Sequence, residues 1–294
     1  MTQCISLQKT TSRRHIFISP AKSFFSPGRA AVLFFVFVFL CVTQKAIGAT
    51  RYTVYFYNPE SNVDNFASLK TRLDVYLKDT GPYQFQPFCD RETFEATIRN
   101  KHNCIFIISS WYYKELRDSF PVKPMLVGTI DGKSIQKKIL SSKIDINNLM
   151  LLKNAGIASA GSEEYTRKYL KSMVGEEYAG VIDTCQILAV PKDIDALISM
   201  GFGLVQAALT TEYSLSKLSA INPGLYKKLT ILAKSGESLQ PIVAVPDANS
   251  PEVAKLLEIV EGMGKTTDGR NCLQMFGIDG WQKPGKSEWE LLRK

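Results

Sequence analysis

Residues 104–112, Cys-Ile-Phe-Ile-Ile-Ser-Ser-Trp-Tyr, carry the clearest indication of the fold. The first five of them are apolar without a break, which is typical of a strand buried on both faces of a sheet. The segment 110–120 follows directly and is expected to form a helix. A strand can be buried on both faces only where helices cover both sides of its sheet.

The same alternation of strands and helices continues on both sides of this stretch. In the first series the expected strands are 52–57, 83–88, 104–109 and 124–130, with expected helices at 63–77, 90–100 and 110–120. In the second series the expected strands are 155–158, 186–190, 205–209, 229–233 and 242–245, with expected helices at 161–173, 193–200, 211–218, 251–263 and 268–275. Asp90 is the expected N-cap of its helix. This order predicts an α/β protein with mainly parallel sheets covered by helices, and two series suggest two lobes.

The positive charge of the chain is concentrated in its leading segment. Residues 1–49 hold six of the 36 Lys and Arg residues and no Asp or Glu. The other 245 residues carry 30 basic and 28 acidic side chains, so their net charge is only +2. The high pI therefore gives no indication of nucleic-acid binding, which would need a basic surface on the folded part.

The leading segment has the features of an export signal. Residues 30–42 form a run of thirteen residues without a charge, preceded by Arg29 and followed by small residues. This order is typical of a secretory signal peptide over residues 1–49, with cleavage expected after Gly48 or Ala49. The alternative is a membrane anchor, but the run is shorter than the roughly 20 residues that span a bilayer. The mature protein is expected to be soluble and exported.

Cysteine and histidine usage limits the possible chemistry. The mature part keeps four cysteines, Cys89, Cys104, Cys185 and Cys272. After export they could form two disulfides or remain thiols, and both alternatives stay open. No Cys-x-x-Cys spacing occurs, and His102 is the only histidine after the leading segment. No metal site, cofactor or catalytic residue is therefore expected, and the chain is not expected to be an enzyme.

Small hydroxyl residues and glycine follow several of the expected strands. In open α/β sheets, ligands bind beyond the carboxyl ends of the strands. The N–H groups at the start of a helix also favour an anion there. The candidate ligand-binding residues chosen on this basis are Tyr57, Ser109, Ser110, Ser159, Gly161, Ser162, Thr210 and Thr211. The alternative is that the serines and threonines only cap helices.

Two further residues complete the candidate set. Glu212 could meet a cationic group on a zwitterionic ligand, or it could merely complement the dipole of its helix. Trp111 could form an aromatic wall of the binding place, or it could belong to the core or its rim.

Three stretches resemble type 2 periplasmic solute-binding proteins. Residues 152–164, Leu-Lys-Asn-Ala-Gly-Ile-Ala-Ser-Ala-Gly-Ser-Glu-Glu, resemble the entry into the second lobe of that family. Residues 190–197 and then 205–209 resemble its helix and the following Asp-Ala-Ala-Leu strand, with Gln206 in place of the Asp. Residues 268–281 resemble the ending of the phosphate/phosphite/phosphonate-binding branch. The resemblance covers roughly residues 50–282.

The resemblance implies two α/β lobes joined by two crossover strands, which close on a solute and deliver it to an ABC permease. Lobe 1 would comprise residues 50–146 plus 233–294, and lobe 2 residues 147–232. Oxyanion binders of this branch often have a Ser-Thr-Ser-Gly run at the second-lobe entry, where this chain has Ser-Ala-Gly-Ser at 159–162.

The expected function is capture of a small polar or anionic solute, with a phosphate- or phosphonate-like oxyanion favoured. The expected protein is a periplasmic monomer that works with an ABC permease of the inner membrane. The alternative is a periplasmic module that senses a solute for a membrane receptor, or assists an enzyme, without transport.

Overall fold

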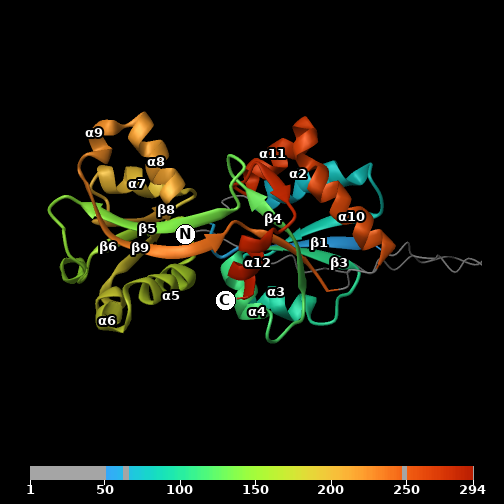
Figure 1. Ribbon diagram of the computed structural model, residues 1–294, viewed down its shortest axis with the longest axis horizontal. Helices are drawn as coiled ribbons and strands as arrows, with labels where there is room; N and C mark the ends of the chain where they lie inside the picture. Colours follow the sequence, from blue (N-terminus) through green and yellow to red (C-terminus); the bar gives the residue numbers. More distant parts are fainter. Residues whose placement is uncertain (1–50, 62–65, 247–249, 294) are drawn as a thin grey trace, which may run out of the picture. The chain divides into compact units, whose positions relative to one another are not determined.

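The computed structural model describes residues 51–61, 66–246 and 250–293, so the predictions for the signal peptide lie outside the described residues. The described chain forms two sheets, each covered by helices (Figure 1). This confirms the α/β class and the two-lobed arrangement predicted from the sequence.

The first sheet has the strand order β11-β4-β10-β3-β1-β2. Its strands are β1 (Tyr52–Tyr57), β2 (Tyr83–Pro87), β3 (Cys104–Ile108), β4 (Lys123–Thr129), β10 (Ile242–Val245) and β11 (Gly280–Gln282). The helical segments that accompany it are α2 (Phe66–Lys78), α3 (Arg91–Ile98), α4 (Ser110–Leu116), α10 (Pro251–Glu261), η2 (Gly262–Lys265), α11 (Thr267–Met275) and α12 (Lys286–Arg293). All five residues of β3 are buried, as its unbroken apolar run predicts.

The strands β1 and β3 present apolar side chains to both faces of the first sheet. Phe56 and Ile105 pack on one face against the cluster formed with α2, α10 and α11. Tyr55 and Phe106 pack on the other face against α3 and α4. Asp90 caps α3 as expected, because its side chain accepts a hydrogen bond from the Thr93 N–H at 2.7 Å. The carboxyl ends of β1 and β3 are thereby held rigidly side by side.

The second sheet has the strand order β7-β6-β8-β5-β9. Its strands are β5 (Ile135–Lys143), β6 (Gly156–Ser159), β7 (Gln186–Ala189), β8 (Ala207–Thr211) and β9 (Leu229–Leu239). Its helical segments are η1 (Leu149–Leu152), α5 (Glu163–Val174), α6 (Glu176–Thr184), α7 (Asp193–Gly201), α8 (Glu212–Ile221) and α9 (Pro223–Tyr226). One face packs on α7 and α8, and the other on η1, α5 and α6.

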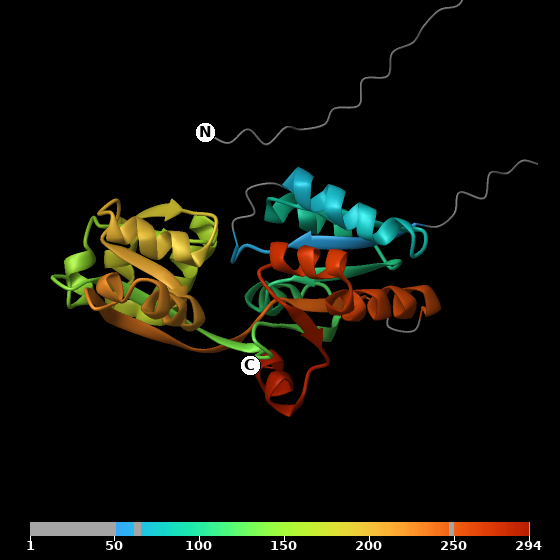
Figure 2. The same cartoon turned by 90° about the horizontal axis from the view of Figure 1, so that it is seen from above.

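The chain crosses between the sheets twice. It passes from β4 in the first sheet to β5 in the second, and it returns from β9 to β10. The strands β5 and β9 pair with each other in antiparallel register, and Figure 2 shows them running together. The Gln240 N–H donates to the Ser134 carbonyl at 2.8 Å, where both crossings leave the second sheet. The two predicted crossover strands are therefore confirmed.

The sheets are mixed, which corrects the prediction of mainly parallel sheets. Among the described strands, four pairings are parallel and five are antiparallel. The reason lies in the crossings. β10 comes back from the second sheet and enters the first from the opposite end, so it runs antiparallel to β3 and β4. β5 likewise runs antiparallel to β8 and β9.

Some elements have no counterpart in the prediction, namely β5, η1, α6, α9, β11 and α12. β5 reads Ile-Gln-Lys-Lys-Ile-Leu-Ser-Ser-Lys, and its lysines and serines hide the alternation that marks a strand. β9 extends to Leu239, whereas the prediction ended it at residue 233. Its second half is polar and therefore gave no apolar pattern from which a strand could be predicted. The polar halves of both strands belong to the crossings.

Three of the cysteines are buried thiols. Cys104, Cys185 and Cys272 are buried without a disulfide, while Cys89 lies at the surface. Burial raises the pKa of the Cys104 thiol to about 12 and that of Cys272 to about 11, so both stay protonated at neutral pH. For these three residues the structure therefore favours the thiol alternative over a disulfide.

Within the described ranges, none of the helices combines the length and apolar character that crossing a bilayer requires.

Candidate functional site

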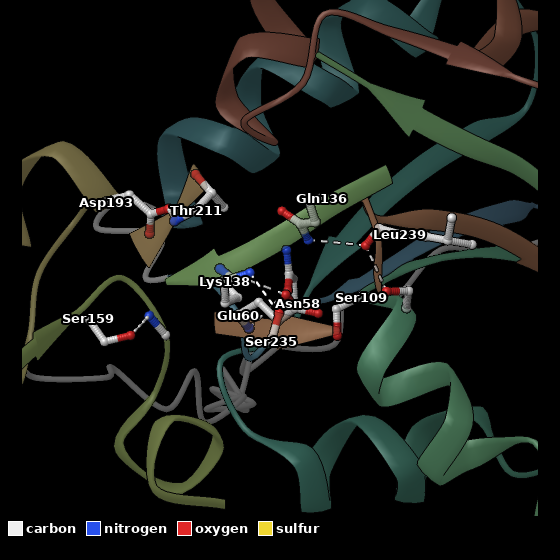
Figure 3. A network of polar contacts seen from close by, with 12 residues as sticks. Asn58, Glu60, Ser109, Gln136, Lys138, Ser159, Asp193, Thr211, Ser235 and Leu239 are labelled. Carbon is white, nitrogen blue, oxygen red and sulfur yellow. Dashed lines mark hydrogen bonds and ion pairs between the residues drawn. The ribbon is translucent and has the colours of Figure 1, made fainter. Parts of the chain in front are cut away.

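The carboxyl ends of β1, β3, β6 and β8 carry most of the residues selected from the sequence. Figure 3 shows this region from close by, with polar side chains from both sheets drawn together. The segments that meet here are far apart in the chain. They include the turn after β1, the start of α4, the crossover strand β5 and the starts of α5, α7 and α8.

The turn after β1 is fixed by its own asparagine. The Asn58 Oδ1 atom accepts a hydrogen bond from the Glu60 N–H at 3.0 Å, which is the bond that an Asn side chain makes in a tight turn. The Pro59 carbonyl accepts from the Ser162 N–H at 2.8 Å. This turn therefore joins the end of β1 to the entry of α5 and positions the Glu60 side chain.

The two serines after β3 face different neighbours. Ser109 caps α4, because its hydroxyl accepts from the Tyr112 N–H at 3.1 Å, and it also donates to the Glu60 carboxylate. The Ser110 hydroxyl donates to the Leu239 carbonyl of β9 at 2.7 Å. Ser110 thus secures the crossover, while Ser109 lies at the polar cluster.

The residues after β6 are packed tightly against the turn after β1. The Ser159 hydroxyl accepts from the Gly161 N–H at 3.2 Å, and the Ser162 hydroxyl caps α5 by accepting from Tyr165 at 3.3 Å. A Cβ atom at Gly161 would overlap the Tyr165 ring and lie 3.1 Å from the Pro59 carbonyl. Glycine is required here because two segments approach closely.

The end of β8 is tied to the start of α7. The Thr211 N–H donates to Asp193 Oδ2 at 2.6 Å, and the Thr211 hydroxyl caps α8 by accepting from Ser214 at 3.2 Å. Thr210 is fully buried, and its hydroxyl has no hydrogen-bond partner among the described residues. Glu212 is 57% exposed and lies 4.0 Å from Lys234, so it faces solvent and a lysine.

The two candidate aromatics differ in their surroundings. Tyr57 packs against Phe94 and Tyr112, with ring centroids 5.3 and 4.8 Å away, and burial raises its pKa to about 12. It belongs to the core of the first sheet. Trp111 packs edge-on against Tyr165 at 5.1 Å and therefore joins α4 to α5.

A buried lysine that the sequence analysis did not select lies at the centre of the region. Lys138 of β5 is only 6% exposed. The β5–β9 register shifts at this residue, which is opposed by Ser235 and Gly236, and the Lys138 N–H donates to the Ser235 hydroxyl at 2.9 Å. Such bulges redirect side chains and are frequent beside functional sites.

The partner of this lysine is Glu60, which the sequence analysis also missed. The Lys138 Nζ lies 4.0 Å from Glu60 Oε2, and their side chains are 7% and 9% exposed. Hydrogen bonding with the Ser109 hydroxyl, the Trp111 N–H and the Tyr165 hydroxyl also lowers the pKa of the Glu60 carboxylate. Figure 3 shows Glu60 between Lys138 and Ser109. The buried carboxylate thus gathers donors from both sheets.

Burial and charge act on this pair in opposite directions. Burial raises the pKa of Glu60, and Lys138 and the hydrogen bonds from Ser109 and Trp111 offset only part of that effect. Burial alone would lower the pKa of Lys138, but Asp193 and Glu60 outweigh it, so the pKa of the lysine is raised. Lys138 therefore stays protonated and faces two carboxylates.

Tyr165 lies beside the pair, and its hydroxyl lowers the pKa of Glu60. Its hydroxyl is buried and makes no hydrogen bond of ordinary geometry with any described residue. Burial is the main cause of its raised pKa, and the Glu60 charge is the next. The hydroxyl therefore stays protonated and acts as a donor toward Glu60.

The region brings polar groups of several kinds together. It offers an ammonium group, two carboxylates, hydroxyls and backbone N–H groups from two sheets. The described residues contain no cluster of three or more His, Cys, Asp or Glu side chains suited to a metal ion. The sequence around Glu60 and Lys138 gives only weak indications of this pair. Glu60 ends the Asn-Pro-Glu turn after β1, and Lys138 precedes the apolar residues Ile139 and Leu140.

Comparison with known proteins gives a family and a fold. Residues 53–289 match the family model described as ABC transporter, phosphonate, periplasmic substrate-binding protein. No curated protein matches the chain.

Three solved structures illustrate the likeness. A binding-protein component of an ABC phosphonate transporter from Pseudomonas aeruginosa is 14% identical with a TM-score of 0.57, over 83% of this chain and 84% of that chain. PhnD1 of Prochlorococcus marinus, in complex with methylphosphonate, is 13% identical with a TM-score of 0.56, over 83% and 96%. A Xanthomonas citri protein bound to ATP is 11% identical with a TM-score of 0.56, over 83% and 95%. At such identities the likeness shows the fold.

The first prediction concerns Lys138. Lys138→Met leaves the buried Glu60 carboxylate without its cation, and breaking a buried pair in this way costs about 3–5 kcal/mol. Lys137→Met is the matched control, because the neighbouring Lys137 forms an exposed pair with Glu237 at 3.4 Å. Exposed pairs contribute about 1 kcal/mol or less. Urea unfolding at pH 7 measures both, and equal losses from the two variants would contradict the assignment.

The second prediction concerns Gly161. Gly161→Ala forces the Tyr165 ring and the Pro59 carbonyl apart, and such overpacking typically costs about 1–3 kcal/mol. The control is Gly180→Ala in the exposed α6, where an added Cβ meets nothing within 4 Å. Alanine in a helix is more favourable than glycine by roughly 0.5–1 kcal/mol, so the control gains stability. Thermal unfolding that shifts both variants in the same direction would refute the close-approach argument.

Proposed function

The chain belongs to the family of periplasmic phosphonate substrate-binding proteins of ABC transporters, and from this premise we propose that it captures a small oxyanion-bearing solute at the polar cluster around Lys138. The solute is a phosphonate or phosphate, or a compound that carries such a group. The protein then presents it to an ABC permease.

The observation that carries this proposal is a buried cation that faces the Glu60 carboxylate, on which hydrogen-bond donors from both sheets also act. Lys138 is buried at a bulge of a crossover strand. The buried Tyr165 hydroxyl acts on Glu60 but makes no close hydrogen bond to a described residue. Buried polar groups are normally hydrogen-bonded, so groups left without partners indicate an absent ligand or water.

The candidate residues divide by role under this proposal. Ser109, Trp111, Gly161 and Ser162 line the place of the solute, because they surround the turn after β1 and the Glu60 carboxylate. Ser159 and Thr211 stabilise the ends of β6 and β8, which lie at the edge of the proposed solute site. The other three candidates would affect binding only indirectly. Tyr57 packs in the core of the first sheet, Ser110 bonds to the crossover strand β9, and Glu212 lies at the surface beside Lys234.

Capture would proceed by closure of one lobe toward the other, with the crossover strands β5 and β9 as the hinge. Ligand closure about a few residues at element ends is a common mechanism for two-lobed binding proteins. The closing contacts already visible are the hydrogen bond from Ser162 to Pro59 and the ring contact of Trp111 with Tyr165. The exact lobe boundaries along β5 and β9, predicted at residues 146/147 and 232/233, are part of this proposal.

Export to the periplasm follows from the family, and we expect the signal to be removed. The expected cleavage is after Gly48 or Ala49, because small residues precede that position. Intact-mass measurement of the protein recovered from the periplasm tests this. A mass that includes residues 1–48 would favour the membrane-anchor alternative.

The binding proposal is tested by calorimetry with the exported protein and a panel of solutes. The panel comprises methylphosphonate, 2-aminoethylphosphonate, phosphate, phosphite, sulfate and amino acids. We expect saturable binding of at least one phosphorus oxyanion and a rise in the melting temperature, since a ligand of the folded state stabilises it by mass action. Saturation at 100 times the Kd corresponds to about 2.7 kcal/mol.

A control titration with sodium chloride at matched ionic strength separates specific capture from screening of surface charge. Binding of amino acids alone, or of nothing in the panel, would contradict the proposed ligand class. The latter result would favour the sensing or accessory role.

A further inference from the structure

The Glu60 carboxylate is surrounded in the way that a bound anion would be. The Lys138 ammonium lies 4.0 Å from it, and hydrogen bonding with the Ser109 hydroxyl, the Trp111 N–H and the Tyr165 hydroxyl lowers its pKa. An ammonium, a hydroxyl and a backbone N–H converging on one carboxylate form the donor set that an oxyanion requires.

The carboxylate is held there by the chain itself. The Asn58 side chain fixes the Glu60 backbone through the 3.0 Å bond to its N–H. The Ser61 N–H donates to the Asn58 carbonyl at 3.4 Å, which closes the turn. No ligand is needed to keep the glutamate in place, so its anion is present at an effectively high local concentration.

A second negative charge makes the region unfavourable for another anion. Asp193 acts on Lys138 together with Glu60, so one buried ammonium already faces two carboxylates. A free phosphonate would add at least one more negative charge to the same place. Like charges brought together in a poorly hydrated region repel strongly, so the incoming anion and Glu60 cannot both remain beside Lys138.

From these contacts we propose that Glu60 is a built-in competitor, whose carboxylate occupies the place of the solute's oxyanion and must leave Ser109, Trp111 and Lys138 before that oxyanion can bind. This inference rests on the proposed function, because it names the position of the oxyanion within the same site. Glu60 then determines affinity and specificity: a solute is retained only if it supplies a better acceptor than a carboxylate, or if it carries a cationic group that Glu60 and Asp193 can meet.

The test removes the carboxylate and keeps its shape. Glu60→Gln preserves side-chain length and hydrogen-bonding capacity but has no negative charge. We expect the exported Glu60→Gln protein to bind methylphosphonate at least tenfold more tightly than the unaltered protein by calorimetry. Glu60→Ala, which removes the carboxylate without adding an amide, is expected to give a gain in the same direction and guards against a folding defect of the first variant.

The matched control is Glu237→Gln. Glu237 also pairs with a lysine of β5, at 3.4 Å from Lys137, but it is half exposed and lies outside the polar cluster. Its replacement should leave the affinity for methylphosphonate within twofold. A tenfold gain in this control would attribute the effect to overall charge and overturn the inference.

The outcomes separate this inference from the proposed function. If the unaltered protein binds methylphosphonate and the Glu60 variants bind it no more tightly, the competitor role is wrong and anion capture stands. If only the Glu60 variants bind it, the competitor role holds and the unaltered protein does not capture a free oxyanion. If neither binds any phosphorus oxyanion while circular dichroism shows both to be folded, both ideas are wrong.

Discussion

A buried ion pair between segments of different sheets constrains everything around it. Removing Glu60 and Lys138 from water costs several kcal/mol per charge, and only close, well-directed contacts can return that free energy. Ser109, Trp111 and Tyr165 act on the Glu60 charge, while the Asn58 turn and the bulge of β5 hold the backbone of the two residues. Apolar residues of similar volume would often serve stability as well or better, so a pair retained at this place is more readily understood through binding than through folding.

The position of Lys138 on a crossover strand couples the pair to the connection between the sheets. The Leu239 carbonyl, at the end of β9, accepts from Ser110 of α4 at 2.7 Å and from Gln136 of β5 at 3.1 Å (Figure 3). The Ser134 hydroxyl, just before β5, donates to the buried Glu288 at 2.6 Å. These bonds hold the first-sheet ends of both crossings. If the angle between the sheets changes, the backbone must therefore bend within β5 and β9, beyond these hydrogen bonds and close to Lys138.

The sequence predicted the parts of the site that depend on local patterns. The burial of β3 and the cap at Asp90 follow from an apolar run and a capping preference that act within a few residues. The strands expected to end at 158 and 209 end one and two residues later, at Ser159 and Thr211. The Glu60–Lys138 pair joins residues 78 positions apart, and no local pattern encodes it. The mixed strand order was equally hidden, because it follows from a crossing strand that contains three lysines and two serines.

The capping serines and threonines show why hydroxyl clusters at strand ends are only a partial guide to groups that are free to bind a ligand. The Ser162 and Thr211 hydroxyls accept from backbone N–H groups of their helices, and Ser110 donates to a carbonyl. These groups already have partners, and a solute would gain little from them. The groups left with capacity are the Lys138 ammonium, the Tyr165 hydroxyl and the donors engaged by Glu60. If Glu60 is the proposed competitor, recognition depends on the glutamate after β1 more than on the Ser-Ala-Gly-Ser run after β6. A shorter hydroxyl run at the second-lobe entry is consistent with a first sheet that brings its own anion to the site.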